Sequence, residues 1–230
     1  MIDLFSYISI GSTLKNKHMA TMNQGILGGF SGKIGTVVGS SWRGKNVLRS
    51  APSVSTKPAS AAQQKQRNKF KGVSQFLTPI KEILTETFGA SVGSKSPFNN
   101  AMSYHMKEAV QQTTVGFQLE YAKVLIGKGG LCGLENPVVQ MLPTHRLQVS
   151  WDDNSTQGLA YPTDAFLIVA YATDLQCFEY AMGESLRETE QGVLSFQESF
   201  YGETVHLWAT FHNAKLALTA TSRYLGSFVI

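Results

Sequence analysis

The sequence has few cysteines, few charged residues and no long hydrophobic run. Cys132 and Cys177 are the only cysteines among 230 residues, and they are too few and too far apart for a disulfide framework or a thiolate metal site. By default we expect two buried, reduced thiols, and a single disulfide between them is the alternative. No run approaches the roughly 18–20 apolar residues of a membrane-spanning helix. The charged fraction of 16% lies below the usual roughly 25%, so charge-driven disorder is not expected over most of the chain.

The sequence also lacks the patterns typical of nucleotide and metal sites. Gly32-Lys33 is followed by Ile34 and not by Ser or Thr, so this glycine-rich segment fails the Walker A pattern. The histidines, at positions 18, 105, 145, 206 and 212, form no pair at metal-ligand spacing. His105 falls on an apolar helical stripe, which indicates a satisfied core histidine. We expect a protein that is not an enzyme, with no catalytic residues, no cofactor, no metal and no small-molecule ligand.

Charge is divided unevenly along the chain. Residues 1–130 hold 16 Lys/Arg and 5 Asp/Glu, a net charge of +11, whereas residues 131–230 hold 4 and 11, a net charge of −7. Between Asp3 and Glu82 there is no acidic residue and there are twelve basic ones. Such asymmetry predicts that one half binds something anionic, or that the halves attract each other or their copies. A solvated basic face is the alternative.

The first residues do not read as a secretory signal. The apolar start has no basic region before it, carries Asp3, and is followed by its lysines instead of preceded by them. We expect residues 1–18 to be a non-native or disordered extension, with translation starting near Met19 or Met22. The protein is then cytoplasmic by default.

Glycine recurs through residues 23–50 at a density that breaks any regular helix. The residues at 36–38 and 46–49 favour short strands, with a turn near Trp42–Lys45. We expect an extended hairpin whose edges need a partner. Residues 51–58 predict an extended linker.

A long amphipathic helix is predicted over residues 59–88. Ser60 and Gln63 fit a capping box, and Pro79 should kink or split the helix. Its apolar stripe consists of Phe70, Val73, Phe76, Leu77, Ile80, Ile83, Leu84 and Phe88. Ser96-Pro97 opens a further helix, with Ser as N-cap and Pro at the first helical position.

After residue 115 the hydrophobic period changes to two. Short alternating runs lie near 145–151, 165–172, 176–181, 192–196, 203–211 and 219–229. In one of them, an inward set alternates with an outward set of Thr204, His206, Trp208 and Thr210. Trp151 suits the buried tryptophan of an early sandwich strand. We expect an α+β protein: a glycine-rich hairpin and two or three helices form a basic domain over 19–130, and an immunoglobulin or fibronectin III-like sandwich forms an acidic domain over 131–230.

Several stretches resemble one family. They are GILGGFSGKIGTVVGSSWRG from Gly25, the helix segment with Gln63, Arg67 and Phe70, and SPFNNA from Ser96. They resemble an uncharacterised domain-of-unknown-function family of Bacteroidota proteins, over roughly residues 22–230. The resemblance implies a glycine-rich start, helices and an immunoglobulin-like C-terminal domain. It implies no activity and no catalytic residues.

The favoured function is a structural or interaction protein acting in assembly or adhesion, with a protein partner or its own copies. We expect Trp42, Arg43, Lys45 and Arg49 to contact the partner as a basic-aromatic tip. In the alternative, Trp42 packs on the helices. A basic half meeting the acidic half of another copy would give a head-to-tail assembly.

Nucleic-acid binding is the alternative function, because basic residues over 33–71 lie near Trp42 and Phe70. Against it, no known nucleic-acid motif is present, and Phe70 belongs to the expected buried stripe. The first turns of the predicted helix carry four basic residues and no acid. This placement opposes the helix macrodipole and favours an anion contact.

Overall fold

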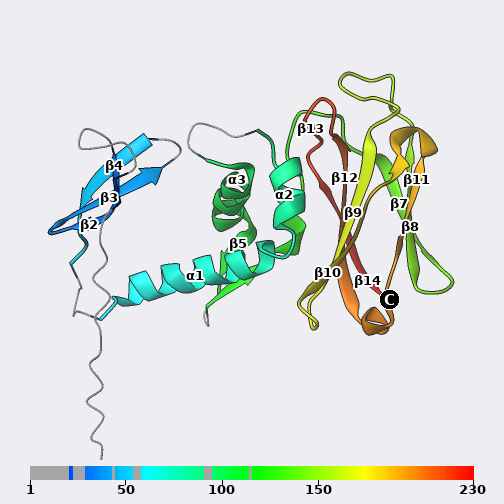
Figure 1. The fold of residues 1–230 in the computed structure, drawn as a ribbon. Coiled ribbons are helices and arrows are strands. Elements are labelled where there is room, and N and C mark those ends of the chain that lie inside the picture. Colours follow the sequence, from blue (N-terminus) through cyan, green and yellow to red (C-terminus); the bar gives the residue numbers. More distant parts are fainter. Residues whose placement is uncertain (1–20, 23–28, 43–44, 54–57, 91–94, 114–115) are drawn as a thin grey trace, which may run out of the picture. The chain divides into compact units, whose positions relative to one another are not determined.

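The chain forms two compact units, Met1–Pro58 and Ala59–Ile230, which we call the N-terminal and C-terminal units. The computed structural model describes residues 21–22, 29–42, 45–53, 58–90, 95–113 and 116–230 (Figure 1). The extension expected over 1–18 lies outside the described residues. The fold mixes helices and strands and is mostly β.

The N-terminal unit is an antiparallel sheet with the strand order β1-β2-β3-β4. Its strands are β1 (Thr21–Met22), β2 (Phe30–Ile34), β3 (Val37–Trp42) and β4 (Lys45–Ser50). The strands expected at 36–38 and 46–49 lie mainly in β3 and β4, and both extend further than expected. Gly35 has a φ of 56° in the tight turn between β2 and β3, a conformation that glycine adopts without a steric cost.

The C-terminal unit begins with helix α1 (Ala61–Leu77), which starts where the sequence predicts. The Ser60 Oγ accepts a hydrogen bond from the Gln63 N–H at 3.3 Å, and the Ser60 N–H donates to Gln63 Oε1 at 3.1 Å. This reciprocal pair is a capping box. The predicted long helix is split at Pro79, and α2 (Lys81–Thr87) follows.

The second predicted helix is α3 (Pro97–Tyr104), and its N-cap Ser96 accepts a hydrogen bond from the Asn99 N–H at 3.3 Å. It continues into one π-helical turn, η1 (His105–Ala109). A short hairpin and a 3-10 turn follow: β5 (Val110–Gln112), β6 (Phe117–Leu119) and η2 (Tyr121–Lys123).

Two antiparallel sheets make up the rest of the unit. A three-stranded sheet has the order β11-β8-β7, with β7 (Glu135–Leu142), β8 (Arg146–Asp152) and β11 (Gln191–Ser195). A five-stranded sheet has the order β10-β9-β12-β13, and β14 also pairs with β12. Its strands are β9 (Ala165–Ala172), β10 (Cys177–Leu186), β12 (Thr204–Asn213), β13 (Leu218–Thr219) and β14 (Arg223–Val229). Two 3-10 turns, η3 (Arg187–Thr189) and η4 (Glu198–Phe200), lie on either side of β11.

One hydrophobic core lies between the two sheets. Its centre includes Trp151 of β8, whose ring stacks on Phe166 of β9 at 4.4 Å between centroids. The Trp151 indole N–H donates to the Arg187 carbonyl oxygen at 2.9 Å. The alternate residues of the facing strands complete this core: Leu147, Val149, Ile168, Ala170, Val205, Leu207, Ala209 and Phe211.

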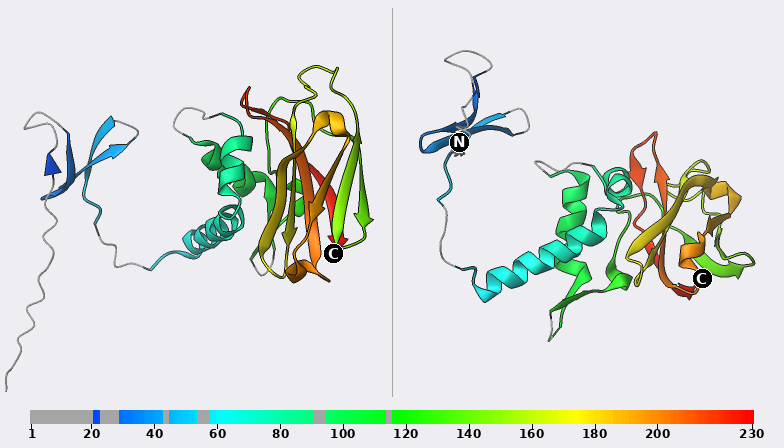
Figure 2. Two further views of the ribbon diagram at one scale, coloured as in Figure 1. Left: turned by 45° about the vertical axis from the view of Figure 1, so that its right-hand side comes forward. Right: turned by 60° about the horizontal axis from the view of Figure 1, so that its bottom comes forward.

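A second core lies on the other face of the five-stranded sheet, where the helices cover it (Figure 2). Trp208 was expected on an outward, polar face, but it is fully buried, and its indole N–H donates to the Tyr121 carbonyl oxygen at 3.1 Å. The expectation fails because the helical layer shields this face from water. The helices thus share a core with the sheet, and the division between units falls after Pro58 instead of near residue 131.

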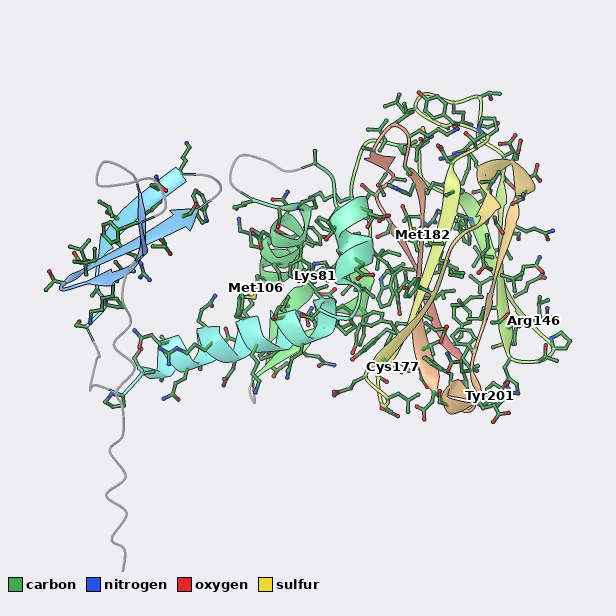
Figure 3. All side chains as sticks on the ribbon, in the orientation of Figure 1. Lys81, Met106, Arg146, Cys177, Met182 and Tyr201 are labelled. Carbon is green, nitrogen blue, oxygen red and sulfur yellow. The ribbon has the colours of Figure 1, made fainter. Side chains whose placement is uncertain are left out.

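Two further expectations about burial are corrected by the structure. Phe70 is 55% exposed, because α1 meets the second core only from Val73 onward. Cys132 and Cys177 are free thiols, but both are half-buried instead of buried. Cys177 begins β10 at the end of that strand marked in Figure 3, and burial raises the pKa of its thiol.

Candidate functional site

The predicted contact residues lie on the hairpin of β3 and β4. Trp42 and Lys45 are directly opposite each other across the two strands, and Arg49 is opposite Val38. Val38 is in turn opposite Lys33 of β2. Because directly paired residues share one face of a sheet and side chains alternate along a strand, these side chains share one face. Arg43 lies outside the described residues.

This face, which we call the basic face, is open to solvent. Trp42 is 53% exposed, and Lys33, Lys45 and Arg49 are exposed. Within the part of the chain that the structure describes, none of these three cations takes part in an ion pair. The basic face therefore carries an exposed tryptophan and three cations that have no ion-pair partner among the described residues.

On the opposite face of the same sheet, none of the described strand residues is charged. It presents Ile34, Val37 and Leu48, which are 51%, 38% and 63% exposed. Phe30 lies over Gly39, where a Cβ would come within 2.6 Å of the Phe30 ring. Gly39 is the only buried residue of this unit among those whose burial is described. The sheet therefore has two accessible faces and almost no interior of its own.

The C-terminal unit holds a buried polar network that the sequence did not predict. Arg187 and Asp164 are both fully buried, and the Arg187 Nη2 and Nε atoms lie 3.0 and 3.1 Å from Asp164 Oδ2. Arg187 also donates to the side chain of Asn154 and to the Cys132 carbonyl oxygen. No sequence motif predicts this network, because its residues lie in loops and at strand ends that are far apart in the chain and meet only in the folded protein.

Each side-chain nitrogen of Arg187 and each carboxylate oxygen of Asp164 has at least one hydrogen-bond partner, and both side chains are fully buried. Asn213 Nδ2 donates to Asp164 Oδ1 at 2.7 Å, and the Arg187 guanidinium lies 3.9 Å from the centre of the Phe211 ring. No buried side-chain nitrogen or oxygen among the described residues lacks a hydrogen-bond partner. A buried, paired and fully bonded charge pair of this kind holds strand ends together.

His105 is a satisfied core histidine, as predicted. It is fully buried, its Nδ1 lies 2.8 Å from the Ala101 carbonyl oxygen, and its Nε2 accepts a hydrogen bond from the Leu125 N–H at 3.2 Å. Since Nε2 accepts from a backbone donor, the proton of the neutral ring is on Nδ1. Burial lowers the pKa of His105 to about 4, against an ordinary value of 6.5.

This lowered pKa predicts a loss of stability in mild acid. The unfolded chain takes up the proton more readily than the folded chain, so the contribution of His105 is complete above pH 6.5 and is lost as the pH falls toward 4. The difference corresponds to about 3 kcal/mol. Urea titrations from pH 7 to pH 4 should show this slope in the wild type and a smaller slope in His105→Gln. Equal slopes in the two proteins would contradict this prediction. The His105→Gln variant should still show some slope, because burial also lowers the pKa of His206 and His212.

Two other histidines, His206 and His212, have neutral hydrogen-bond partners. His206 Nδ1 lies 2.8 Å from the Tyr224 hydroxyl, and its ring stacks on Tyr121 at 3.9 Å. His212 Nδ1 lies 2.9 Å from the Thr219 hydroxyl. The described residues contain no group of three His, Cys, Asp or Glu side chains placed to hold a metal ion.

Two short patterns of enzyme families occur in the chain without their structural context. Gly39 to Asn46 follows a Walker A loop up to its last position, which is Asn and not Ser or Thr, but here β3 leads into β4 and not into a helix. Gly89-Ala90-Ser91-Val92-Gly93 has the spacing of a nucleophile elbow. That elbow requires a strand before it, whereas α2 precedes Gly89, and 91–94 lie outside the described residues.

The fold is that of a mixed, mostly β protein in which helices cover the outer face of one of two packed sheets. Residues 29–226 match the family described as a family of unknown function, DUF6266. The chain belongs to this family, which confirms the predicted membership of a domain-of-unknown-function family. The bacterial group named with that prediction stays a prediction.

The remaining comparisons add little. The comparison with curated proteins returned no match. Among solved structures, the chain is similar to the fn3 domain of human collagen alpha-1(XX) chain, with a TM-score of 0.33 and 16% identity over 45% of this chain and 89% of that one. None of the described helices has the length and apolar character needed to cross a membrane.

Proposed function

We propose that this protein is a non-enzymatic assembly or adhesion component whose N-terminal sheet binds a partner protein or another copy. The observation that carries this proposal is the sheet itself, which has a basic face, an apolar face and almost no interior. Isolated small sheets are marginally stable unless they pack against something. A sheet edge and faces of this kind are what strand-adding and sheet-stacking contacts use.

We also propose that the two sheets of the C-terminal unit form a fibronectin III-like sandwich that supports this contact. Two observations support this proposal: β11-β8-β7 and β10-β9-β12-β14 belong to two separate antiparallel sheets, and Trp151 of β8 is buried in the core between them. Such sandwiches supply rigid edges and loops for recognition and need no catalytic site.

Charge points to other copies of the chain as the partner. Residues 131–230 carry 11 Asp/Glu and 4 Lys/Arg, and two of these charges, Asp164 and Arg187, compensate each other inside the fold. The remaining acidic excess complements the basic face. Contact between a basic surface of one copy and an acidic surface of the next is heterologous and gives head-to-tail assembly.

The test is the mass of the purified protein by light scattering at about 0.15 M salt, with and without nucleic acid. We expect a defined oligomer that nucleic acid does not change. The pair Lys45→Glu and Arg49→Glu should weaken association by about tenfold or more, because it puts like charges at the contact. The matched pair Lys71→Glu and Lys107→Glu, which reverses two exposed lysines of the C-terminal unit, should leave the mass unchanged.

Nucleic-acid binding is the second candidate, because Trp42, Lys45 and Arg49 share one face of the sheet. A ring beside cations can stack on a base while the cations bind phosphates. A wild-type monomer whose mass rises only with DNA or RNA would contradict the assembly proposal and establish this one. A monomer that is unaffected by nucleic acid would contradict both self-assembly and nucleic-acid binding.

A further inference from the structure

A groove of about 550 Å³ lies in the C-terminal unit between the first half of α1 and the β5–β6 hairpin. Its two walls come from separate segments of the chain. Helix α1 contributes Ala62, Lys65, Gln66, Asn68 and Lys69, and the hairpin contributes Val110, Gln112, Thr113, Gly116 and Phe117. The groove is independent of the N-terminal sheet, because all of its lining residues lie after Pro58.

Along one face of α1, the side chains change from lysines in its first half to apolar residues in its second half. Lys65 and Lys69 lie four residues apart and on the same face as Val73 and Phe76. Val73 and Phe76 are 0% and 5% exposed and pack in the second core. One and two turns earlier, the same face carries Lys69 and Lys65 instead of apolar residues, and these lysines line the groove. The first half of α1 extends away from the sheets of this unit (Figure 3).

The groove is positively charged, and no acidic residue is among the described residues that line it. Within the described chain, Lys65 and Lys69 form no ion pair. The nearby Glu120 is already held by the Lys123 Nζ at 2.8 Å and by Gln111 Nε2 at 2.6 Å. Both lysines lie in the N-terminal half of α1, and the first turn of that helix has no acidic residue to offset their charge. An anionic ligand would compensate these two positive charges.

Side-chain amides line the groove beside the lysines. Gln66, Asn68 and Gln112 each offer both a donor and an acceptor. A peptide backbone also presents donors and acceptors, whereas a phosphodiester backbone presents acceptors only. The aromatic ring of Phe117 is not free to stack on a base, because it packs so tightly on α1 that a Cβ at Gly72 would lie 2.3 Å from it.

We propose that this groove binds an extended acidic peptide segment of a partner protein. Lys65 and Lys69 pair with the carboxylates of the peptide, and the amides of Gln66, Asn68 and Gln112 bind its backbone. Charge-assisted pairs give affinity and on-rate, and the bifunctional amides select a peptide over other polyanions.

The experiment uses the full chain and a fluorescein-labelled peptide of alternating glutamate and serine, with binding followed by anisotropy. We expect salt-dependent binding that the pair Lys65→Gln and Lys69→Gln weakens by about tenfold, the effect of losing two partly exposed ion pairs. The control pair is Arg67→Gln and Lys71→Gln, which removes the same charge from the opposite face of the same helix. It should change affinity by less than about twofold, since long-range charge is screened.

Three outcomes would overturn the proposal. They are the absence of peptide binding, equal losses in the two variant pairs, and an oligothymidylate that binds more tightly than the peptide and displaces it. Circular dichroism of both variant pairs checks that α1 stays folded, which is expected because all four side chains lie outside the buried cores. The Lys45→Glu and Arg49→Glu protein should bind the peptide as the wild type does, so failure here and failure of the assembly proposal are distinguishable.

Discussion

Replacing Asp164 by Ala should lower the free energy of unfolding by about 3–5 kcal/mol. The change leaves the guanidinium of Arg187 buried and without its carboxylate, at a position with 0% exposure. It also removes the acceptor of the Asn213 side chain at 2.7 Å and of the Tyr161 N–H at 2.9 Å. Since domains are stable by only about 5–15 kcal/mol in total, the variant should unfold at a much lower urea concentration.

The physical reason is the asymmetry between removing one charge and removing both. An unpaired buried ion keeps its desolvation cost and loses its attraction, whereas a pair replaced by apolar groups loses both. The double variant Asp164→Leu with Arg187→Met should therefore recover part of the loss. The two single variants should not be additive, because they share one network.

The control is an exposed acid in the turn between β9 and β10, at the other end of β9 from Asp164. Asp174→Ala should change the free energy of unfolding by no more than about 0.5 kcal/mol, because Asp174 is exposed. If Asp164→Ala costs as little as Asp174→Ala in urea titrations, the buried pair does not form in solution.

Local signals in the sequence predicted local structure well. The capping box of Ser60 and Gln63, the break at Pro79 and the Ser96-Pro97 helix start all depend on residues close together in the chain, and the structure has each of them. His105 was predicted as a core residue by its place on a helical stripe. Hydrogen bonds within one or two turns of a helix can be predicted from the sequence, because they need particular residue types at a fixed spacing.

Features that depend on distant segments were not predictable. Trp208 alternates with apolar neighbours just as an outward residue would, and only the helices, more than 80 residues earlier in the chain, explain its burial. Phe70 follows the helical period of Val73 but lies one turn before the core begins. Arg187 and Asp164 meet because β9 and β10 are neighbours, and no motif encodes that pairing.

The basic face of the N-terminal sheet was also only partly predictable from the sequence. The sequence placed basic and aromatic residues on a hairpin, but the separation of Lys33, Trp42 and Arg49 from Ile34 and Leu48 follows from strand register. A shift of one residue would exchange the two faces. For the groove beside α1, the sequence contained one signal, the basic residues in the early turns of the helix. The second wall, the β5–β6 hairpin, could not be predicted, because only the fold brings the hairpin next to α1.

The second large expected effect concerns the part of the chain that folds by itself. A fragment of residues 59–230 should unfold cooperatively, and a fragment of residues 131–230 should be aggregated or poorly ordered. Without the helices, the shorter fragment exposes the outer face of β9 and β12, where four large side chains are buried in the intact unit. These are Leu167, Val169, Tyr171 and Trp208.

The size of this effect follows from the area that the helices cover. Burial of one such side chain contributes about 1.5–3 kcal/mol, so four contribute about 6–12 kcal/mol, which equals the whole stability of a typical domain. Urea unfolding followed by tryptophan fluorescence, with light scattering to detect aggregation, separates the two fragments. A 131–230 fragment that is monomeric and unfolds at the same midpoint as 59–230 would mean that the sheets form an independent domain beginning near residue 131.

A point change in the intact chain tests the same contact without truncation. Trp208→Ala should lower the free energy of unfolding by about 3–5 kcal/mol, because the helical layer can close only partly over the space that the indole leaves.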